Sequence, residues 1–285
     1  MKRSILLLIP FAVFVTLFVV CPALVGLYSS FTNYDPRGSV PVRFVGASNY
    51  ALLISDKEFQ SAVRNAALFV PATVIIEMGV GVVLAYVLRK PFPGRGAVRV
   101  ILLIPWLISP VANGVMWRFL FHRKTGLQNV IPSLLGLPGL PDLRGPGYAI
   151  VTVIFIEIWR KVPFVGFLVL PAIISIPTEQ WDIAELEGMS HFVRVCQIVV
   201  PRLRRLLLTI MFLLFGDSLG VFESIYILYG GGPRLDAIVP GFYSYWKAFK
   251  VFSWTLGSTS AWLIAAAVLL FGACYLVLMR LKETQ

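Results

Sequence analysis

Long apolar runs separated by shorter, more polar connections dominate the chain. The runs are about as long as the roughly 20 residues that a helix needs to cross the hydrocarbon core of a bilayer. Because a lipid-exposed backbone must satisfy its own hydrogen bonds, such runs predict transmembrane helices. The pattern predicts an all-α, polytopic membrane protein that forms one domain over residues 1–285. Six spans are expected, at residues 4–30, 65–88, 100–117, 148–176, 206–229 and 255–279.

The amino-acid composition points to the same class. Of the 285 residues, 58% are hydrophobic and only 14% are charged, and the mean hydropathy is +0.83. An ordinary soluble domain is about 45–50% apolar and about 25% charged. The chain therefore has too little charge to cover a water-facing surface, which excludes a soluble enzyme, a coiled coil and a disordered protein.

The first apolar run follows Lys2 and Arg3 at the N-terminus. A cleaved signal peptide has an apolar core of about 7–15 residues, followed by a small-residue cleavage site. This run is longer and no clean A-x-A site follows it, so we predict a retained helix. With six spans, both chain ends lie on the same side of the membrane.

Basic residues give the orientation of these spans. The formal net charge is +11, from 25 Lys and Arg against 14 Asp and Glu, and basic residues that flank spans explain it better than nucleic-acid binding does. With the N-terminus inside, 14 Lys and Arg fall on the inner side and 11 on the outer side, or 12 against 11 when Arg160 and Lys161 are left out because they lie within a predicted span. The inner clusters at helix ends are Lys2-Arg3, Arg89-Lys90, Arg202-Arg204-Arg205 and Arg280-Lys282. Both termini are therefore predicted to be cytoplasmic.

Three connections between the spans are long. Residues 32–60 have mixed polarity and predict an outer loop with a short helix. Residues 121–147, rich in Gly, Pro and Leu, predict a shallow outer lid with little regular structure. The inner segment 177–201 is compatible with a helix but cannot be a span. Thr178 is its predicted N-cap, and Pro201 marks its predicted far boundary.

Motifs for nucleotide, metal and nucleophile chemistry are absent from the sequence. It has no G-x-x-x-x-G-K-[ST], since no Lys follows a Gly, and no H-E-x-x-H or G-x-S-x-G. His122 and His191 lie on opposite predicted sides of the membrane and lack a ligand set. We predict no catalytic residue, no metal and no cofactor. The run Gly230-Gly231-Gly232-Pro233 predicts a turn at a helix end.

The inner segment carries a recognisable motif. It reads Trp181-Asp182-Ile183-Ala184-Glu185-Leu186-Glu187-Gly188-Met189, with Pro201 thirteen residues after Gly188. This resembles the EAA loop of the permease subunits of binding-protein-dependent ABC importers, which reads aromatic-Glu-Ala-Ala-x-x-Asp-Gly-Ala with a Pro at the same distance. The sequence keeps the Gly, the spacing and the acidic pattern, and departs from the motif at Asp182, Ile183, Glu187 and Met189.

Further motifs are similar to those of the carbohydrate branch of that family, the maltose-type and glycerol-phosphate-type permeases. Their order and spacing extend over nearly the whole chain, which makes the set specific although each motif alone is weak. They are Phe44-Val45-Gly46 with Asn49-Tyr50, Pro105-Trp106 with Ile108-Ser109-Pro110, Trp159 with Pro163-Phe164 and Ser175-Ile176-Pro177, and Val221-Phe222-Glu223 before Gly231-Gly232-Pro233.

The resemblance implies a permease subunit that forms the translocation pathway of an ATP-driven importer for a sugar or sugar-like solute, in a bacterial-type inner membrane. The implied partners are a dimer of ATP-binding subunits on the cytoplasmic side, a second related permease subunit, an extracytoplasmic solute-binding protein and membrane lipid, with no nucleic acid. The inner segment is then a cytoplasmic coupling helix, at whose end Gly188 permits a sharp turn or a close approach. The implied coupling residues are Asp182, Ala184, Glu185, Glu187 and Gly188.

Charged residues inside the predicted spans are candidates for the substrate pathway. Such side chains cost at least a few kcal/mol when they face lipid, so they face the bundle interior or water, often in pairs. Glu157 lies at helical spacing from Arg160 and Lys161, so mutual neutralisation is one interpretation and a polar cavity is the other. Glu77 is interpreted as a buried pairing residue. The candidate pathway residues are Trp106, Asn113, Glu157, Arg160, Lys161, Phe164, Asp217 and Ser218.

Two other functions compete with an ATP-driven permease. An ion-coupled secondary transporter would use Glu157 or Asp217 as a proton site, but the inverted repeats common in that class are not visible in the sequence. A non-transporting membrane scaffold would not need charges inside its spans. The sequence does not identify the sugar, because cavity charges of mixed sign suit neutral, amino and phosphorylated sugars alike.

Overall fold

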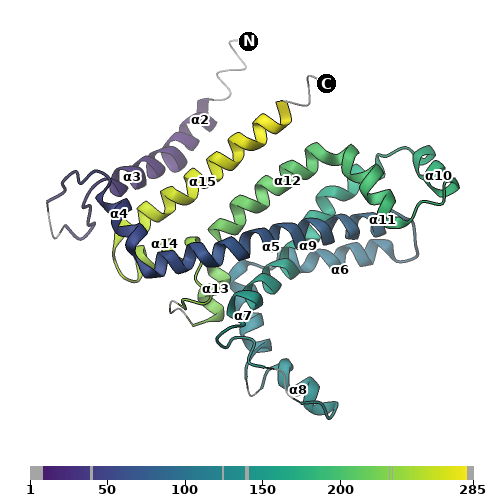
Figure 1. Ribbon diagram of the computed structural model, residues 1–285, viewed down its shortest axis with the longest axis horizontal. Helices are drawn as coiled ribbons and strands as arrows, with labels where there is room; N and C mark the ends of the chain where they lie inside the picture. The colour runs from purple at the N-terminus through teal and green to yellow at the C-terminus, as the bar shows by residue number, and fades with distance from the viewer. Residues whose placement is uncertain are drawn as a thin grey trace.

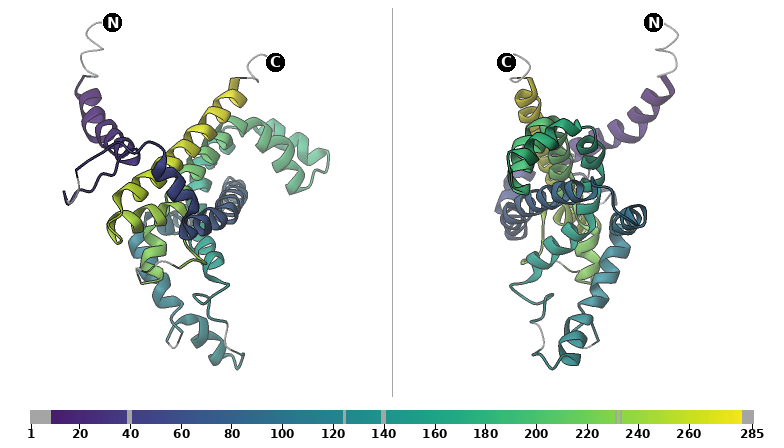
Figure 2. Two further views of the ribbon diagram at one scale, coloured as in Figure 1. Left: turned by 60° about the vertical axis from the view of Figure 1, so that its left-hand side comes forward. Right: turned by 90° about the vertical axis from the view of Figure 1, so that its right-hand side faces the viewer.

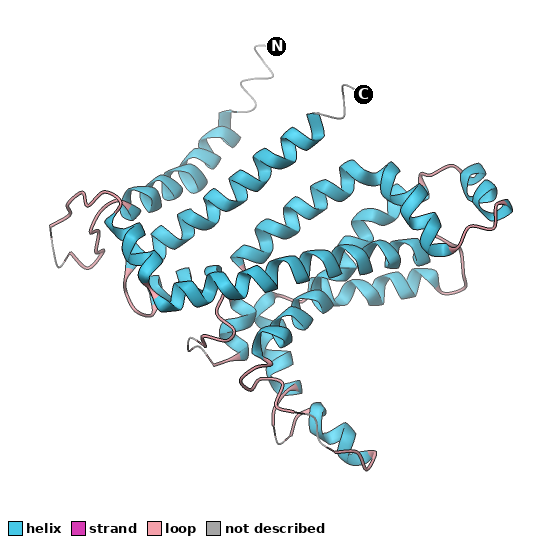
Figure 3. Ribbon diagram, in the orientation of Figure 1, coloured by secondary structure: helices cyan, strands magenta, loops and turns pink. Residues whose placement is uncertain are grey.

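Helices make up the fold. The computed structural model describes residues 9–38, 41–123, 125–138, 141–230, 232 and 234–280. In these ranges the regular structure is helical, apart from one isolated antiparallel bridge between Thr32 and Phe44 (Figure 3). The prediction of an all-α protein is confirmed. Some residues on which the sequence predictions relied lie outside the described ranges, namely Lys2, Arg3, Gly231, Pro233 and Lys282.

The centre of the molecule is the contact between α5 (Lys57–Leu88) and α9 (Ala149–Ile174), which run side by side in Figure 1. Two glycines bring their backbones together. A Cβ atom on Gly81 would lie 2.5 Å from the Cβ of Val165, and one on Gly166 would meet a Leu84 methyl at 2.9 Å. Small residues at such a crossing allow the close packing on which helix association in membranes depends.

Two helical runs pass through a proline by way of a wider turn. In each run the residue before the proline donates its backbone N–H to the carbonyl five positions back, Cys21 to Thr16 and Val200 to Val195. This turn leaves room for a proline ring that would clash with the carbonyl four positions back. Pro201 therefore lies inside a helical run and is not the boundary that the sequence predicted. The runs are α2 (Ile9–Val15), η1 (Thr16–Val20) and α3 (Cys21–Ser30), and α11 (His191–Arg194), η2 (Val195–Val199) and α12 (Val200–Gly220).

The predicted span at residues 100–117 is not one helix. It consists of α6 (Arg95–Leu107) and α7 (Pro110–Leu120), which meet at a bend of 94°. Pro110 disfavours a helical conformation at the residue before it, and Ser109 is extended with ψ 149°. The Ser109 hydroxyl then accepts a hydrogen bond from the backbone N–H of Ala112 and caps the new helix. The sequence prediction missed this break although the proline was visible.

The predicted span at residues 206–229 is wrong at both ends. Its helical run begins at α11, and α12 stops at Gly220. Val221 is extended, and the chain then forms the short helix α13 (Glu223–Leu228). The turn predicted at the end of this region is confirmed for Gly230, which has φ +76° directly after the C-cap of α13.

The predictions for the connections at residues 32–60 and 121–147 had mixed success. The short helix expected within residues 32–60 is α4 (Ser48–Ser55). The segment expected to be a shallow lid with little regular structure instead contains α8 (Leu127–Leu134), which extends away from the helical body in all views (Figures 1 and 2). Its apolar residues are spaced to form a helix, which the Gly and Pro content of the surrounding segment obscured.

α14 (Pro240–Phe249) packs on α15 (Trp254–Arg280), the last predicted span. Gly257 makes this contact possible, because a Cβ atom there would lie 2.7 Å from the Cβ of Ala248. The helix α14 was not predicted. Its sequence is short and aromatic, and only packing against α15 and α5 distinguishes it from a loop.

A polar cluster ties α14 to the start of α5. Lys247 Nζ lies 2.8 Å from Asp56 Oδ2 and 3.0 Å from Glu58 Oε2, and the Tyr243 hydroxyl donates to Asp56 Oδ2 at 2.9 Å. Burial opposes the charge of Asp56, but the bonds from Lys247 and Tyr243 outweigh it and lower the pKa of this carboxyl below its usual 3.8. Burial also opposes the charge of Lys247, yet its bonds to Asp56 and Glu58 raise its pKa above the usual 10.5.

Length and apolar composition identify part of the predicted membrane domain. Within the described ranges, three helices qualify as spans, at Ile9–Ser30, Lys57–Leu88 and Trp254–Val277, and the bent pair of α6 and α7 makes up to four. Two further helices, α9 and α12, have 26 and 21 residues and so reach the necessary length. Both carry charged residues, which is why composition alone does not mark them as spans.

Candidate functional site: a polar pocket at two helix breaks and a helical segment at one end

The two interrupted helices meet at a polar pocket. The half-helices α7 and α13 lie side by side and run parallel. Gly114 permits their close approach, because it packs directly against Ser224 and Ile227. At their N-terminal ends lies a pocket of about 220 Å³. It is lined by Pro110, Glu157, Arg160, Asp217, Gly220, Val221, Glu223 and Ser224.

Three carboxylates line this pocket, and the helix ends explain why they are tolerated there. The N-terminus of a helix carries a partial positive charge that stabilises nearby anions. Pro110 begins α7 and Glu223 begins α13, and both residues line the pocket, so both helix starts face it. The three carboxylates therefore lie at the N-terminal ends of α7 and α13, where the helix dipoles stabilise negative charge.

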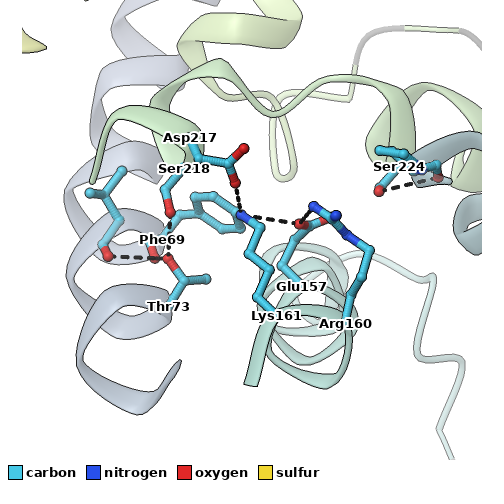
Figure 4. A network of polar contacts seen from close by, with 10 residues as sticks. Phe69, Thr73, Glu157, Arg160, Lys161, Asp217, Ser218 and Ser224 are labelled. Atoms are coloured by element: carbon cyan, nitrogen blue, oxygen red, sulfur yellow. Dashed lines mark hydrogen bonds and ion pairs between the residues drawn. The ribbon is translucent and has the colours of Figure 1, made fainter. Parts of the chain in front are cut away.

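An ionic network connects α9 with the end of α12 beside the pocket (Figure 4). Glu157 Oε2 lies 2.8 Å from Arg160 Nη2 and 3.3 Å from Lys161 Nζ, and Lys161 also forms an ion pair with Asp217. The side chains of Glu157 and Lys161 are only 1% and 4% exposed, whereas that of Asp217 is 58% exposed. The pairing of Glu157 with both basic neighbours on its helix, one of the two interpretations of the sequence, is confirmed.

α5 contributes a second layer to the network. The Thr73 hydroxyl lies 3.3 Å from the Ser218 hydroxyl and bonds to the Phe69 carbonyl at 2.8 Å. Glu77, one turn further along α5, is fully buried, and neither of its carboxylate oxygens has a hydrogen-bond partner among the described residues. The interpretation of Glu77 as a residue held in a close pair is therefore wrong for this structure.

The other candidate pathway residues lie near the pocket without lining it. Trp106 stacks on Phe164 with ring centroids 5.1 Å apart, and the Trp106 side chain is partly exposed beside α9. Asn113 is fully buried in α7, and its amide oxygen and nitrogen find no hydrogen-bond partner in the described part of the chain. The structure thus brings the four charged candidates and Ser218 close together. The stacked rings of Trp106 and Phe164 and the amide of Asn113 lie apart from them.

Five residues of the pocket were not predicted from the sequence, namely Pro110, Gly220, Val221, Glu223 and Ser224. Glu223 is half-buried, and the Ser224 hydroxyl approaches the Pro110 carbonyl at 3.5 Å. Glu223 falls within the predicted span at residues 206–229 but was not assigned to the pathway. In a continuous helix it would lie nearly two turns beyond Asp217. The break after Gly220 brings it back to the same pocket.

The EAA-like segment forms a helix with a defined end. α10 (Thr178–Leu186) has Pro177 at its N-cap. The prediction of Thr178 as the N-cap is therefore wrong, because Thr178 is the first residue of the helix. At the other end Met189 N–H bonds to the Ala184 carbonyl and Gly188 N–H to the Glu185 carbonyl. This is the Schellman arrangement, and Gly188 supplies the left-handed residue that it needs, with φ +66°.

Aromatic and basic residues hold this segment against α5, and sequence reasoning did not find them. Arg89 lies 3.8 Å from the ring centroid of Trp181 and 4.4 Å from that of Tyr86. The Tyr86 hydroxyl shares a 3.0 Å hydrogen bond with His191 Nδ1. The end of α5 is thereby joined to both α10 and α11. A basic residue near an aromatic residue is too common in sequences to have signalled this contact.

The exposed face of the segment is partly apolar. Ile183, Leu186 and Phe192 are 54%, 89% and 77% exposed. Asp182, Glu187 and Gly188 are also exposed, and Glu185 lies 3.6 Å from Arg194. Ala184 differs from the other implied coupling residues, because it is buried inside the chain. Large apolar side chains in this position are typical of a surface that a partner covers.

Apolar helices interrupted around a polar pocket are typical of membrane transport proteins. The fold matches the crystal structure of a bacterial ABC transporter involved in the import of the acidic polysaccharide alginate, with a TM-score of 0.82 and 22% identity over 98% of this chain and 96% of that chain. The family described as "Binding-protein-dependent transport system inner membrane component" matches residues 77–284, and the chain belongs to this family. It is therefore an inner-membrane permease component of an ABC importer and not an enzyme.

Named relatives agree with this assignment. The chain is 30% identical to the trehalose/maltose transport system permease protein MalF of Thermococcus litoralis, over 81% of this chain and 78% of the relative. It is 26% identical to the sulfoquinovosyl glycerol transport system permease protein SmoG of Agrobacterium fabrum, over 98% and 91%. Family membership confirms the resemblance seen in the sequence and excludes the secondary transporter and the scaffold.

Proposed function

We propose that this permease subunit carries a sugar or sugar-like solute and forms the translocation pathway together with a second, related permease subunit. The names of the relatives support a carbohydrate-like cargo, because they refer to trehalose, maltose and sulfoquinovosyl glycerol. An extracytoplasmic binding protein would deliver the solute, and a dimer of ATP-binding subunits would drive its passage.

The pocket at the two helix breaks is the observation that carries the proposal. It offers carboxylate acceptors from Glu157 and Glu223 and guanidinium donors from Arg160, which suits hydroxyl groups that both donate and accept. Its volume of about 220 Å³ is below the roughly 300–1,000 Å³ of typical ligand pockets. A pathway completed by a second subunit would have this property, since one chain supplies only part of the wall.

We further propose that the whole chain is one transmembrane domain with six spans and cytoplasmic termini. α9 and α12 would be the two additional spans, because their charges at Glu157, Lys161 and Asp217 pair with each other instead of facing lipid. The clusters of basic residues at the inner helix ends support the orientation.

The segment of α10 and α11 is proposed to be the cytoplasmic coupling element. Exposed Ile183 and Leu186 would insert into the ATP-binding subunit, and Asp182 would pair with a basic residue there. The rigid end at Gly188 and the contacts of Trp181 and His191 with α5 would carry the movement into the membrane domain.

Reconstitution tests this function. The complex with its second permease and ATP-binding subunits is placed in proteoliposomes, and uptake of radiolabelled trehalose and maltose is measured with the binding protein outside. We expect uptake that requires both internal ATP and the binding protein, and that stops with a catalytically inactive ATP-binding subunit. Uptake that follows an imposed proton gradient without ATP would contradict the proposal.

A further inference from the structure

A second polar pocket lies at the opposite end of the α7–α13 pair. Its volume is about 210 Å³, and it is lined by Arg118, Asp142, Arg144, Leu228, Tyr229 and Arg234. Three arginines thus surround one space, at the C-terminal ends of both half-helices. None of them belongs to the ionic network around Glu157.

Hydrogen bonds between separate segments hold the walls of this pocket in place. Arg234 Nη1 donates to the Arg144 carbonyl at 2.5 Å, and the Tyr229 hydroxyl donates to the Ala149 carbonyl at 2.9 Å. Arg144 N–H donates to Asp142 Oδ1 at 3.1 Å in a tight turn. The arginines are therefore carried by a connected framework and not by independent loops.

The charges in the pocket are not balanced, because three arginines lie near only two carboxylates, those of Asp142 and Asp236. Arg234 is neutralised by Asp236, which accepts from its Nε at 3.0 Å and from its Nη2 at 2.8 Å. Among the described residues, Arg118 donates to the Ile227 carbonyl at 3.3 Å and to no other acceptor, and the buried Nε of Arg144 has no hydrogen-bond partner. Within the described residues, neither Arg118 nor Arg144 forms an ion pair. A guanidinium has five N–H donors, so several remain unused.

Attraction to the partial negative charge at the helix ends explains the position of only one of these two arginines. The C-terminal end of α13 carries partial negative charge, and Arg118 caps it through the Ile227 carbonyl. Arg144 makes no such contact, although its Nε is removed from water. Leaving a charged donor buried without an acceptor is unfavourable, so an anionic partner at Arg144 would stabilise it.

We propose that this pocket binds an oxyanion, a carboxylate or a phosphate, held between Arg118 and Arg144. Planar guanidinium forks bind such groups through paired charge-assisted hydrogen bonds. The oxyanion would come either from an acidic solute or from an acidic side chain of the binding protein. The inference rests on the proposed orientation, which places this pocket on the extracytoplasmic side.

The first experimental arm tests a small anion. Binding of inorganic phosphate and of glucuronate to the purified importer complex in nanodiscs is measured by calorimetry. We expect Arg144→Gln and Arg118→Gln each to weaken binding at least about tenfold, as for the loss of a charge-assisted hydrogen bond. Arg123→Gln is the matched control, since Arg123 is an exposed arginine on the neighbouring segment and does not line the pocket. It should leave the affinity unchanged.

The second arm tests the binding protein as the source of the oxyanion. Its association with the same nanodiscs is followed by biolayer interferometry. If its acidic side chain is the ligand, Arg144→Gln weakens association at least about tenfold, Arg123→Gln does not, and added glucuronate does not bind. If neither small anion binds the wild-type complex and neither pocket variant changes association with the binding protein, the inference is overturned.

Folding and transport are controlled separately. Arg144→Lys keeps a positive charge, so it should bind the oxyanion better than Arg144→Gln does. Equal loss of oxyanion affinity in both Arg144 variants, together with loss of the monodisperse complex, would show damage to the fold. The affinity of the Arg118→Gln variant then decides whether the pocket binds the oxyanion. ATP-driven uptake of trehalose or maltose by the wild type that persists without any oxyanion binding would overturn this inference alone and leave the proposed function standing.

Discussion

At the scale of single residues, Lys161 has the most demanding environment in the protein. It lies almost completely buried between Glu157 on its own helix and Asp217 on α12. Breaking a buried ion pair by removing one partner leaves the other charge uncompensated, which typically costs about 3–5 kcal/mol. The network therefore joins two helices, and its members cannot be exchanged independently.

A double-mutant cycle separates structural pairing from a role in transport. We expect Glu157→Gln and Lys161→Met each to reduce ATP-driven uptake at least about tenfold and to lower the thermal stability of the complex, because each strands the remaining charges. In the double variant stability should largely recover while uptake stays low, since the pocket still lacks the Glu157 carboxylate. Full recovery of uptake in the double variant would show that the charges only pair with each other.

Gly188 provides a second test at the residue scale. Its φ of +66° is open to Asn at small cost but is strained for a β-branched residue. No atom lies within 4 Å of a Cβ built there, so the chain itself offers no steric obstacle. Gly188→Val should weaken co-purification of the ATP-binding subunit about tenfold, at a cost of about 1–2 kcal/mol in the turn. Gly188→Asn should retain most of it.

The two outcomes at Gly188 have different meanings. Equal loss in the Val and Asn variants would show that side-chain bulk against the partner matters, and not the backbone conformation. Wild-type association and ATP hydrolysis in Gly188→Val would contradict the role of this turn in coupling.

At the scale of elements, α5 connects the two parts of the candidate site. Its middle contacts the network through Thr73 and Ser218, and its end is joined to α10 and α11 through Tyr86 and Arg89. One helix therefore contacts both α12 beside the ionic network and the EAA-like segment. A displacement of the segment would reach the pocket through α5.

Removing the cation at the end of α5 tests this connection. Arg89→Met keeps the length of the side chain but loses the contacts with the rings of Trp181 and Tyr86, each worth about 0.5–2 kcal/mol. We expect the number of ATP molecules hydrolysed per solute transported to rise about two- to tenfold, because hydrolysis continues while its mechanical link is loosened. Lys90→Met, at the exposed basic neighbour, is the control and should behave as wild type. An unchanged ratio in Arg89→Met would contradict the link.

At the scale of the whole molecule, contacts far apart in the sequence close the helical body. In Figure 1 the segment of α10 and α11 lies at one end and α4 at the other, and α5 runs between these ends. Lys247 on α14 binds Asp56 and Glu58 at the start of α5, and the Asn65 amide donates to the carbonyls of Leu235 and Ile238. These contacts fix the second half of the chain to the first.

The Asp56–Lys247 pair predicts a dependence of stability on pH. The pKa of Asp56 is lowered, so its contribution is present above pH 3.8 and is lost as the pH falls through the folded value. The pKa of Lys247 is raised, so its contribution is present below pH 10.5 and is lost as the pH rises through the folded value. Between these limits, Lys247→Met should lower the free energy of unfolding by about 1–3 kcal/mol.

Thermal unfolding of the purified complex between pH 3 and pH 11 measures this effect. The difference between wild type and Lys247→Met should be largest near neutral pH and shrink toward both extremes. Lys57→Met, at an exposed lysine of the same region, should differ little from wild type at any pH. A wild-type advantage that stays constant to both extremes would exclude this ion pair as its source.

Cysteine labelling tests the orientation of the whole molecule. After the natural cysteines are replaced, a cysteine at Ser133 on α8 should react with an impermeant maleimide added to intact cells. A cysteine at Ser190, beside the EAA-like segment, should react only after permeabilisation. Both positions are exposed. The reverse labelling pattern would overturn the proposed orientation.

The sequence by itself determined the all-α class, the approximate positions of the long helices and the family. Apolar runs and the spacing of the EAA-like motif are local, one-dimensional signals, so they survive without knowledge of packing. The Glu157–Arg160–Lys161 pairing was predictable for the same reason, because its members are one turn apart on one helix. Gly188 was readable from its motif, and its positive φ agrees with the turn expected there.

Only the tertiary structure decided where the helices break and which residues those breaks bring together. Pro110 ends α6 and begins α7, whereas Pro201 is absorbed by a wide turn inside a helix, and the two prolines look alike in sequence. The Lys161–Asp217 pair and the Arg89–Trp181 contact join residues that are distant along the chain. Such contacts depend on the relative placement of whole helices, which is set by close approaches such as Gly81 against Val165 and not by any local pattern.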